Sequence, residues 1–199
     1  MNSTKTQKLK EIEGEIKACS KCSLHKTRKF PVPGEGIIDN RIILIGLGPG
    51  YHENLQGKPF VGAAGKFLDE LLELAGLTRK EVYITNIIKC YLSDNKPTQE
   101  EIKICTHYLD KQIEIIKPRL IITLGNIATT YILQKFGFKS ESMFKIHGKI
   151  FQVSNLLLQA KIIPMYHPAS ALYNPGMKEI LRLDWETIED KLNLIIKQN

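Results

Sequence analysis

The sequence predicts an α/β fold in which a mostly parallel sheet of four core strands lies between layers of helices. Short apolar, β-branched runs recur along the chain, and segments with helical spacing separate them. Such strand-then-helix units build parallel sheets, because each connecting helix crosses back over the sheet. No internal repeat or linker divides the chain. We therefore expect one domain over residues 1–199, with segment 1–40 packed on it.

The four core strands are apolar runs without alternation, which is typical of strands buried on both faces. They are expected at 41–46 (RIILIG), 82–88 (VYITNII), 119–125 (RLIITLG) and 160–166 (AKIIPMY). The stretch 144–154 (FKIHGKIFQVS) instead alternates apolar and polar residues. This pattern predicts a hairpin that turns near His147-Gly148.

Five segments carry helical spacing or helix-end signals. The N-terminal helix, expected at 5–18, places its apolar residues on one face. Thr98 precedes Glu101 at the spacing of a capping box, so it predicts the start of a helix at 98–117. The other helices are expected at 65–76, where Gly76 marks the end, at 126–137 and at roughly 176–197.

The composition indicates a packed core and an excess of positive charge. Lys+Arg total 28 and Asp+Glu total 21, so the net charge is +7. A basic surface favours a polyanionic partner such as nucleic acid, because each cation that meets a phosphate releases counterions. No apolar run reaches the roughly 18 residues of a membrane helix, and the polar N-terminus is unlike a signal peptide. We expect a soluble, intracellular protein with no membrane partner.

The four cysteines favour a metal site. Cys19 and Cys22 form a C-x2-C pair, and Cys90 and Cys105 follow with fourteen residues between them. Disulfides would suit a secreted protein, which nothing in the sequence indicates, and unconnected cysteines are a further alternative. Four thiolates could complete a zinc site or hold an iron–sulfur cluster. The spacing does not choose between these two.

Glycine-rich and polar segments follow the four strands, at the edge of the sheet where α/β proteins form their sites. The loop GLGPG at 46–50 is similar to a dinucleotide-binding loop. However, Pro49 has no amide hydrogen, Tyr51 interrupts the glycine pattern, and no acidic residue ends the second strand. The loop could instead offer backbone N–H groups to a carbonyl or an oxyanion.

Five side chains near these strand ends each have a structural and a functional interpretation. Phe60 is either a core side chain or a stacking platform for a base. Asn86 either bridges two loops or reads the edge of a pyrimidine, whose N3–H and O4 match its acceptor and donor. His167 either caps a loop or donates to an oxygen that gains negative charge. Leu172 and Tyr173 either pack on the last helix or form a wedge between stacked bases.

Together these segments resemble the family 4 uracil-DNA glycosylases, the iron–sulfur branch of the uracil-DNA glycosylase superfamily. The similarity covers residues from about 15 to 195 and rests on C-x2-C at 19–22, VPGEG at 32–36, GLGPG at 46–50, GKPFVGAAGKFLDELL at 57–72, YITNIIKC at 83–90, Cys105 and HPASALYNP at 167–175.

The resemblance implies a three-layer α/β/α sandwich and a monomeric DNA-repair enzyme of the cytoplasm, acting in an archaeal or bacterial nucleoid. Such an enzyme flips deoxyuridine out of double- or single-stranded DNA and hydrolyses its N-glycosidic bond to leave an abasic site. The resemblance also implies a 4Fe-4S cluster. Its ligands would be Cys19, Cys22, Cys90 and Cys105.

Residue roles follow from the same resemblance. Uracil would be bound by Gly46, Leu47, Gly48, Phe60, Asn86 and His167, with Phe60 stacked on the base and His167 facing its O2. Leu172 and Tyr173 would form the DNA wedge, and many relatives have arginine where this chain has Tyr173. A group near Tyr51 is expected to exclude the methyl group of thymine.

Leu47 departs from the family pattern, because most relatives carry a glutamate there. Family 1 enzymes carry an aspartate at the position of Gly48, and it assists the attacking water. With neither carboxylate present, we expect Glu53 to act catalytically beside His167 by positioning the water. Three alternatives stay open: a broader-specificity glycosylase of a neighbouring family, for example on hypoxanthine, a nucleotide-dependent oxidoreductase, and a non-catalytic, metal-stabilised DNA-binding module.

Overall fold

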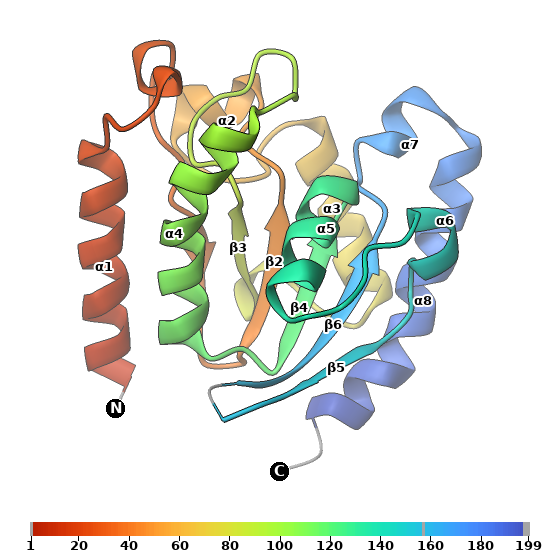
Figure 1. Ribbon diagram of the computed structural model, residues 1–199. Coiled ribbons are helices and arrows are strands. Elements are labelled where there is room, and N and C mark those ends of the chain that lie inside the picture. Colours follow the sequence, from red (N-terminus) through yellow and green to blue (C-terminus); the bar gives the residue numbers. More distant parts are fainter. Residues whose placement is uncertain (1, 157, 197–199) are drawn as a thin grey trace.

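A six-stranded sheet forms the centre of the protein, with strand order β1-β3-β2-β4-β6-β5. The computed structural model describes the backbone of residues 2–156 and 158–196 and the side chains of residues 4–156 and 158–188. Helices cover both faces of the sheet (Figure 1). The predicted α/β fold with a mostly parallel sheet between helical layers is confirmed.

The four central strands run parallel to one another and match the four predicted core strands within two residues at each end. They are β2 (Ile42–Gly46), β3 (Tyr83–Asn86), β4 (Leu120–Leu124) and β6 (Gln159–Met165). Every residue of β2, β3 and β4 is buried. This burial on both faces explains why their sequences are apolar without alternation.

Two short antiparallel strands extend the sheet at its edges, so the prediction of four strands was two strands short. β1 (Glu35–Gly36) pairs with β3, and its two residues are too few to show a pattern. β5 (Phe151–Ser154) pairs with β6. The expected hairpin turn near His147-Gly148 is wrong, because α6 (Met143–Ile146) directly precedes it and buries both of its end residues at helical spacing.

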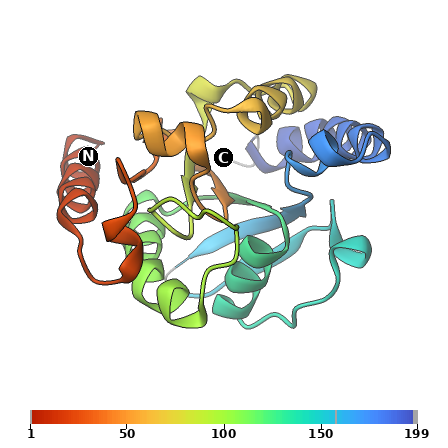
Figure 2. The same ribbon diagram turned by 90° about the horizontal axis from the view of Figure 1, so that it is seen from above.

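Two layers of helices enclose the sheet (Figures 1 and 2). One layer contains α1 (Asn2–Ala18), α4 (Gln99–Ile116) and α5 (Asn126–Lys135), and the other contains α3 (Ala63–Leu74) and α8 (Gly176–Ile196). These are the five predicted helices, although the predicted end of the last one at residue 197 lies outside the described residues. None of the described helices is long and apolar enough to cross a membrane.

Each face of the sheet has its own hydrophobic core. Ile16 and Leu109 pack on one face, and Leu71 and Trp185 pack on the other. All four of these side chains have no exposed surface. Burying a large apolar side chain contributes about 1.5–3 kcal/mol, so these two cores fix the sheet and therefore the positions of its strand ends.

The order of the strands places the site. β2 lies between β3 and β4, so the chain passes from β2 to β3 on one side and then crosses to β4 on the other side of β2. Ligands of open α/β sheets bind at such a switch point, beside the carboxyl ends of the strands. Two short helices, α2 (Tyr51–Gln56) and α7 (Ser170–Tyr173), lie in segments that the sequence analysis read as loops at this edge.

The capping box of α4 gives a test of local stability. The Thr98 side chain accepts from the Glu101 N–H at 3.1 Å, and Glu101 accepts from the Thr98 N–H at 2.8 Å. We expect Thr98→Ala to lower the free energy of unfolding by about 1 kcal/mol in urea denaturation. Ser142 occupies the N-cap of α6 without a side-chain cap, so Ser142→Ala is the matched control. Equal effects of the two substitutions would contradict this assignment.

Candidate functional site

A cavity of about 490 Å³ opens at the carboxyl ends of the central strands. We call it the strand-end pocket. Eight of the predicted site residues line it: Leu47, Gly48, Glu53, Phe60, Asn86, His167, Leu172 and Tyr173. The tertiary structure therefore brings together side chains that are up to 126 residues apart in the chain, from Leu47 to Tyr173 (173 − 47 = 126).

Asn86 presents a buried hydrogen-bond acceptor to the strand-end pocket. It is the last residue of β3 and is 2% exposed. Among the described residues, its Oδ1 has no hydrogen-bond partner. An unpaired buried acceptor costs about 1–3 kcal/mol, so a ligand that donates to it would gain that amount. Gly46 does not line the cavity but makes room for this arrangement, because a Cβ at Gly46 would collide with Oδ1.

A buried lysine holds the backbone of Asn86. The Lys89 ammonium donates to the Asn86 carbonyl at 2.7 Å, to Thr85 Oγ1 at 2.7 Å and to Gln112 Oε1 at 2.8 Å. Gln112 belongs to α4, so these bonds tie the end of β3 to a helix. Burial lowers the pKa of Lys89 to about 7. The sequence analysis did not identify this residue, because a lysine within YITNIIKC gives no sign that it is buried.

Phe60 forms one wall of the strand-end pocket in a constrained backbone conformation. Its φ is +51°, a left-handed value that is rare for an aromatic residue. The Arg79 guanidinium donates to the carbonyls of Pro59 at 3.1 Å and Phe60 at 2.7 Å. A Cβ at Gly65 would collide with the Phe60 carbonyl, so only glycine fits there. Arg79 and Gly65 thus fix the Phe60 ring in place.

Glu53 holds the same loop from the side of the cavity. Its Oε1 accepts from the backbone N–H groups of Val61 at 2.8 Å and Gly62 at 2.9 Å. Within the described part of the chain, its Oε2 is left for other partners. Tyr51 does not line the strand-end pocket and is 60% exposed, whereas the neighbouring His52 lines it.

His167 faces the strand-end pocket as a neutral imidazole. Its ring stacks on Phe60, with the centroids 5.6 Å apart and the planes at 26°. Burial of the ring lowers the pKa of His167 to about 4, although nearby Glu53 opposes this effect. Nδ1 accepts from the Ala169 N–H at 3.1 Å. The proton of the neutral ring therefore lies on Nε2, which can donate to a ligand.

Leu172 and Tyr173 lie on α7 beside the strand-end pocket. Leu172 is 49% exposed and Tyr173 is 86% exposed. Exposed apolar and aromatic side chains at the edge of a pocket are a suitable wedge for separating stacked bases. The high exposure of Tyr173 disfavours the interpretation that it packs on the last helix, and Leu172 leaves half of its surface free beside the cavity.

All four cysteines line one small, mainly apolar cavity between α1, α4 and the end of β3. All four are free thiols, so the disulfide alternative is not seen. Arg28 donates to Cys90 Sγ at 3.1 Å, and the Lys89 N–H donates to Cys105 Sγ at 3.3 Å. Burial raises the pKa of Cys90, and it raises that of Cys105 to about 11. Within the described residues, no three candidate ligands are placed to hold a single metal ion.

Comparison with known proteins identifies the family. A sequence model of the uracil DNA glycosylase superfamily matches residues 33–189. The chain belongs to the uracil DNA glycosylase superfamily. It is 44% identical to a type-4 uracil-DNA glycosylase of Saccharolobus solfataricus, over 92% of this chain and 85% of that protein. It is 42% identical to a protein of the same name from Archaeoglobus fulgidus, over 92% of each chain.

A type-5 uracil-DNA glycosylase of Pyrobaculum aerophilum is more distant. It is 32% identical to this chain, over 81% of this chain and 74% of that protein. The resemblance to family 4 that the sequence motifs indicate is therefore confirmed. The sequence analysis did not identify Lys89 and Arg79, which hold Asn86 and Phe60 in the strand-end pocket. Both act through hydrogen bonds to backbone carbonyls, which the sequence does not reveal.

The low pKa of His167 makes the stability of this superfamily member dependent on pH. The unfolded histidine titrates near 6.5 and the folded one near 4. Between these values the unfolded state binds more protons than the folded state. The contribution of His167 to the free energy of unfolding is therefore fully present above pH 6.5 and is lost as the pH drops toward 4.

We expect the wild type to lose roughly 2 kcal/mol more than His167→Gln between pH 7 and pH 4, measured by urea denaturation. The same pH dependence in both proteins would contradict a buried, neutral His167.

Proposed function

We propose that the protein removes uracil from DNA by hydrolysing the C1′–N1 bond of a flipped deoxyuridine. The observation that carries this proposal is the unpaired, buried Oδ1 of Asn86 beside the ring of Phe60. Base-reading enzymes accept an extruded nucleotide in a pocket that stacks on the base and bonds to its edge. The names of the type-4 relatives support uracil as that base.

Asn86 and Phe60 account for recognition of the base. Asn86 Oδ1 would accept from uracil N3–H, and its Nδ2 would donate to O4. Cytosine has an acceptor at N3 and a donor at N4, so it would leave both groups of Asn86 mispaired. Phe60 would stack on the face of the base, a contact worth about 1–3 kcal/mol. Leu47 and Gly48, which follow Gly46 at the end of β2, would complete the wall of the uracil pocket.

His167 would stabilise the leaving group. As the C1′–N1 bond breaks, its electron pair moves to the uracil ring, and the sugar becomes an oxocarbenium-like cation, as in other glycoside hydrolyses. The negative charge reaches O2, where the Nε2–H of His167 would donate. Such a preorganised donor contributes about 10²–10³ in rate. A water oxygen then bonds to C1′ and releases a proton, while uracil N1 gains one.

Glu53 would position the attacking water. Its Oε1 is occupied by two backbone N–H groups, so Oε2 is the oxygen that would accept from the water. Glu53 would then have two roles, because its carboxylate would position the water and also holds the loop that carries Phe60. The absence of a carboxylate at Leu47 and Gly48 makes Glu53 the candidate within the strand-end pocket.

Leu172 and Tyr173 would fill the space that the extruded nucleotide leaves in the DNA. Both are exposed beside the strand-end pocket, and both belong to the same chain as the residues that line it, so the wedge needs no second copy of the protein. We therefore propose a monomeric enzyme, with residues 1–199 as one domain. Because its substrate is DNA in single- or double-stranded form, we place its activity inside the cell with the genomic DNA.

A 4Fe-4S cluster is the group that we propose for the cysteine cavity. Cys19, Cys22, Cys90 and Cys105 share that cavity. Four thiolates could complete a zinc site or hold such a cluster. The resemblance to family 4 supports the cluster, and the N–H donors to two of the Sγ atoms are typical of the surroundings of a cluster. The cluster would tie the segment before β1 to α4.

Base release from defined oligonucleotides tests the proposed activity. We expect release of uracil from U·G pairs and single-stranded DNA, detected by alkali cleavage of the abasic sites. Asn86→Ala should lower the rate by about 10²–10³ while the thermal unfolding temperature and the iron content stay close to those of the wild type. No release by the iron-loaded wild type would overturn the proposal. Release of hypoxanthine at a similar rate would favour the broader specificity of the neighbouring family.

Arg79 provides a test of the Phe60 wall. We expect Arg79→Met to lower kcat/KM for uracil release by about tenfold to a hundredfold, because the Phe60 ring is no longer held in position. In a Phe60→Ala background the same change should have little further effect. Arg182→Met is the control, since the partners of Arg182 within the described residues are carboxylates on the surface. Independent, additive losses from Arg79→Met and Phe60→Ala would contradict this role.

A further inference from the structure

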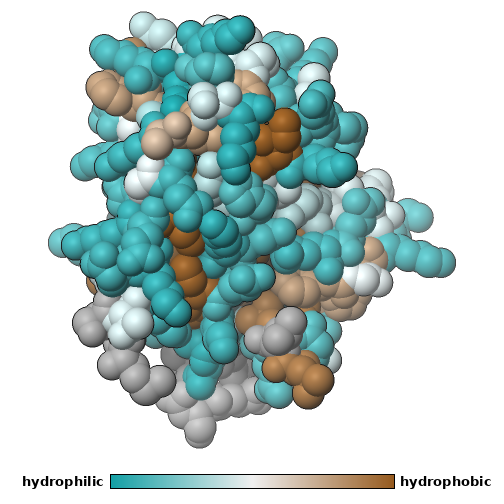
Figure 3. All heavy atoms as spheres, turned by 60° about the vertical axis from the view of Figure 1, so that its left-hand side comes forward, coloured by the Kyte–Doolittle hydropathy of each residue, from teal (hydrophilic) through white to brown (hydrophobic). Residues whose placement is uncertain are grey.

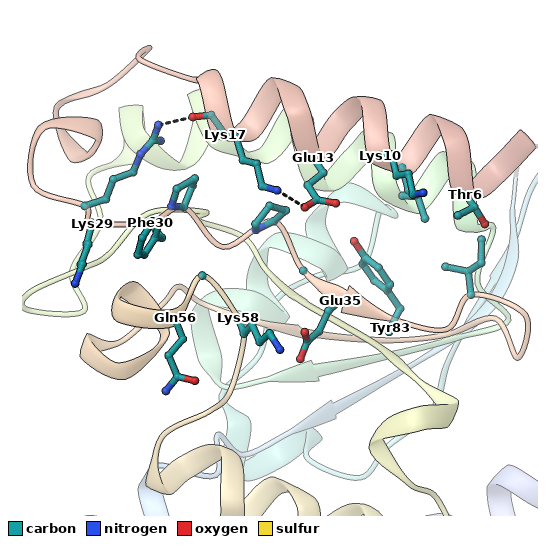
Figure 4. A pocket seen from close by; sticks show the side chains of 18 residues that line it. Thr6, Lys10, Glu13, Lys17, Lys29, Phe30, Glu35, Gln56, Lys58 and Tyr83 are labelled. Atoms are coloured by element: carbon teal, nitrogen blue, oxygen red, sulfur yellow. Dashed lines mark hydrogen bonds and ion pairs between the residues drawn. The ribbon is translucent and has the colours of Figure 1, made fainter.

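A second cavity, of about 920 Å³, lies beyond α2 from the strand-end pocket. We call it the side groove. One wall is formed by α1 and the other by the extended segment 28–38, and Tyr83 lies on its floor (Figure 4). In the space-filling view, brown apolar side chains lie recessed between teal hydrophilic ones on this side of the molecule (Figure 3). Neither base recognition nor bond cleavage in the strand-end pocket uses this groove.

The side groove carries an excess of positive charge. Five cations line it: Lys10, Lys17, Arg28, Lys29 and Lys58. The two carboxylates that line it already have cationic partners. Glu13 pairs with Lys17 at 2.6 Å, and Glu35 lies 3.9 Å from Arg79. Lys17 is thus neutralised by Glu13, and Arg28 is bound to Cys90 Sγ and to backbone carbonyls. The remaining exposed lysines, Lys10, Lys29 and Lys58, favour an anionic occupant.

One aromatic side chain stands at the end of the side groove next to α2. Phe30 is 47% exposed, and the Lys29 ammonium lies 5.9 Å from the centroid of its ring. An exposed aromatic ring beside lysines is the combination that binds single-stranded nucleic acid, since bases stack on the ring and phosphates meet the cations. An acidic peptide would use the lysines but would have no need of an exposed ring.

The side groove is joined to the strand-end pocket through α2. The backbone N–H of Lys29 donates to Asn54 Oδ1 at 2.7 Å, and that of Phe30 donates to the Asn54 carbonyl at 3.1 Å. Asn54 follows Glu53, which lines the strand-end pocket. A nucleic-acid strand that places one nucleotide in that pocket would therefore meet Lys29 and Phe30 after crossing a helix of six residues.

We propose that the side groove binds the single-stranded DNA that flanks the target nucleotide on one side. The inference rests on the proposed function, because it takes the strand-end pocket as the place of the flipped base. The exposed ring of Phe30 offers a stacking face to unpaired bases, which favours a single strand over a duplex. The groove would give single-stranded substrates a binding contribution that duplex substrates lack.

The test compares flanks of different lengths on single-stranded oligonucleotides that carry one uracil near the 5′ end, near the 3′ end or in the middle. The groove variant combines Lys29→Gln, Phe30→Ala and Lys58→Gln. The control variant combines Phe144→Ala, Lys145→Gln and Lys149→Gln, which removes the same side chains from the α6 region on the opposite side (Figure 1). Phe144 is 82% exposed. Both variants are first checked for iron content and unfolding temperature.

For the wild type and the control we expect a long flank on one side, but not on the other, to lower KM by about tenfold, the size expected for a stacked base. The groove variant should lack this effect and keep its rate on duplex and short-flank substrates. Its binding should also depend less on salt, by about 0.7 in the slope of log affinity against log salt for each phosphate that the groove no longer neutralises. An unchanged flank effect in the groove variant would overturn the proposal.

Binding to uracil-free single-stranded DNA, measured by fluorescence anisotropy, separates this proposal from the proposed function. If the wild type bound such DNA through the groove but released no uracil, the result would contradict the proposed function and would support DNA binding by the groove. If it released uracil with no flank effect, the groove proposal would fail alone. Binding of poly-glutamate by the wild type but not by the groove variant, without any flank effect, would identify an acidic protein partner instead and would also overturn it.

Discussion

The buried Oδ1 of Asn86, which has no partner among the described residues, is the constraint around which the site is built. Leaving it unpaired costs about 1–3 kcal/mol in the free protein, so the surrounding structure must hold it in place. Three features do so. Parallel pairing fixes the end of β3 beside β2, Gly46 leaves room for the side chain, and Lys89 holds the backbone carbonyl from below.

The opposite wall of the strand-end pocket depends on a strained backbone that other residues maintain. Phe60 adopts a positive φ, a conformation that costs about 1–3 kcal/mol and persists only when its surroundings enforce it. Arg79 binds its carbonyl, and Glu53 binds the two N–H groups that follow. Because Glu53 also faces the cavity, the residue that we propose for positioning water helps to hold the wall against which the base would stack.

The cysteine cavity and the strand-end pocket share one short segment of chain. Asn86 lines the strand-end pocket. Three residues later, Lys89 donates its backbone N–H to Cys105 Sγ, and Cys90 directly follows Lys89. A group that binds the cysteines would therefore restrain the chain just after β3, at Cys90, four residues from Asn86, whose side chain we propose contacts the base. The proposed cluster has no chemical task in the hydrolysis. Its role would be to hold this segment, and with it Asn86, in position.

The sequence alone determined the parallel sheet, its helices and the capping of α4, because these depend on local patterns of apolar residues and helix-end signals. Its motifs also indicated the family and eight of the residues that line the strand-end pocket. The tertiary structure decided what patterns do not encode. β1 is too short to be recognised, and α6 forms because Met143 and Ile146 reach the core. The roles of Lys89 and Arg79, and the groove beside Phe30, arise from contacts between distant segments, which exist only after the sheet brings those segments together.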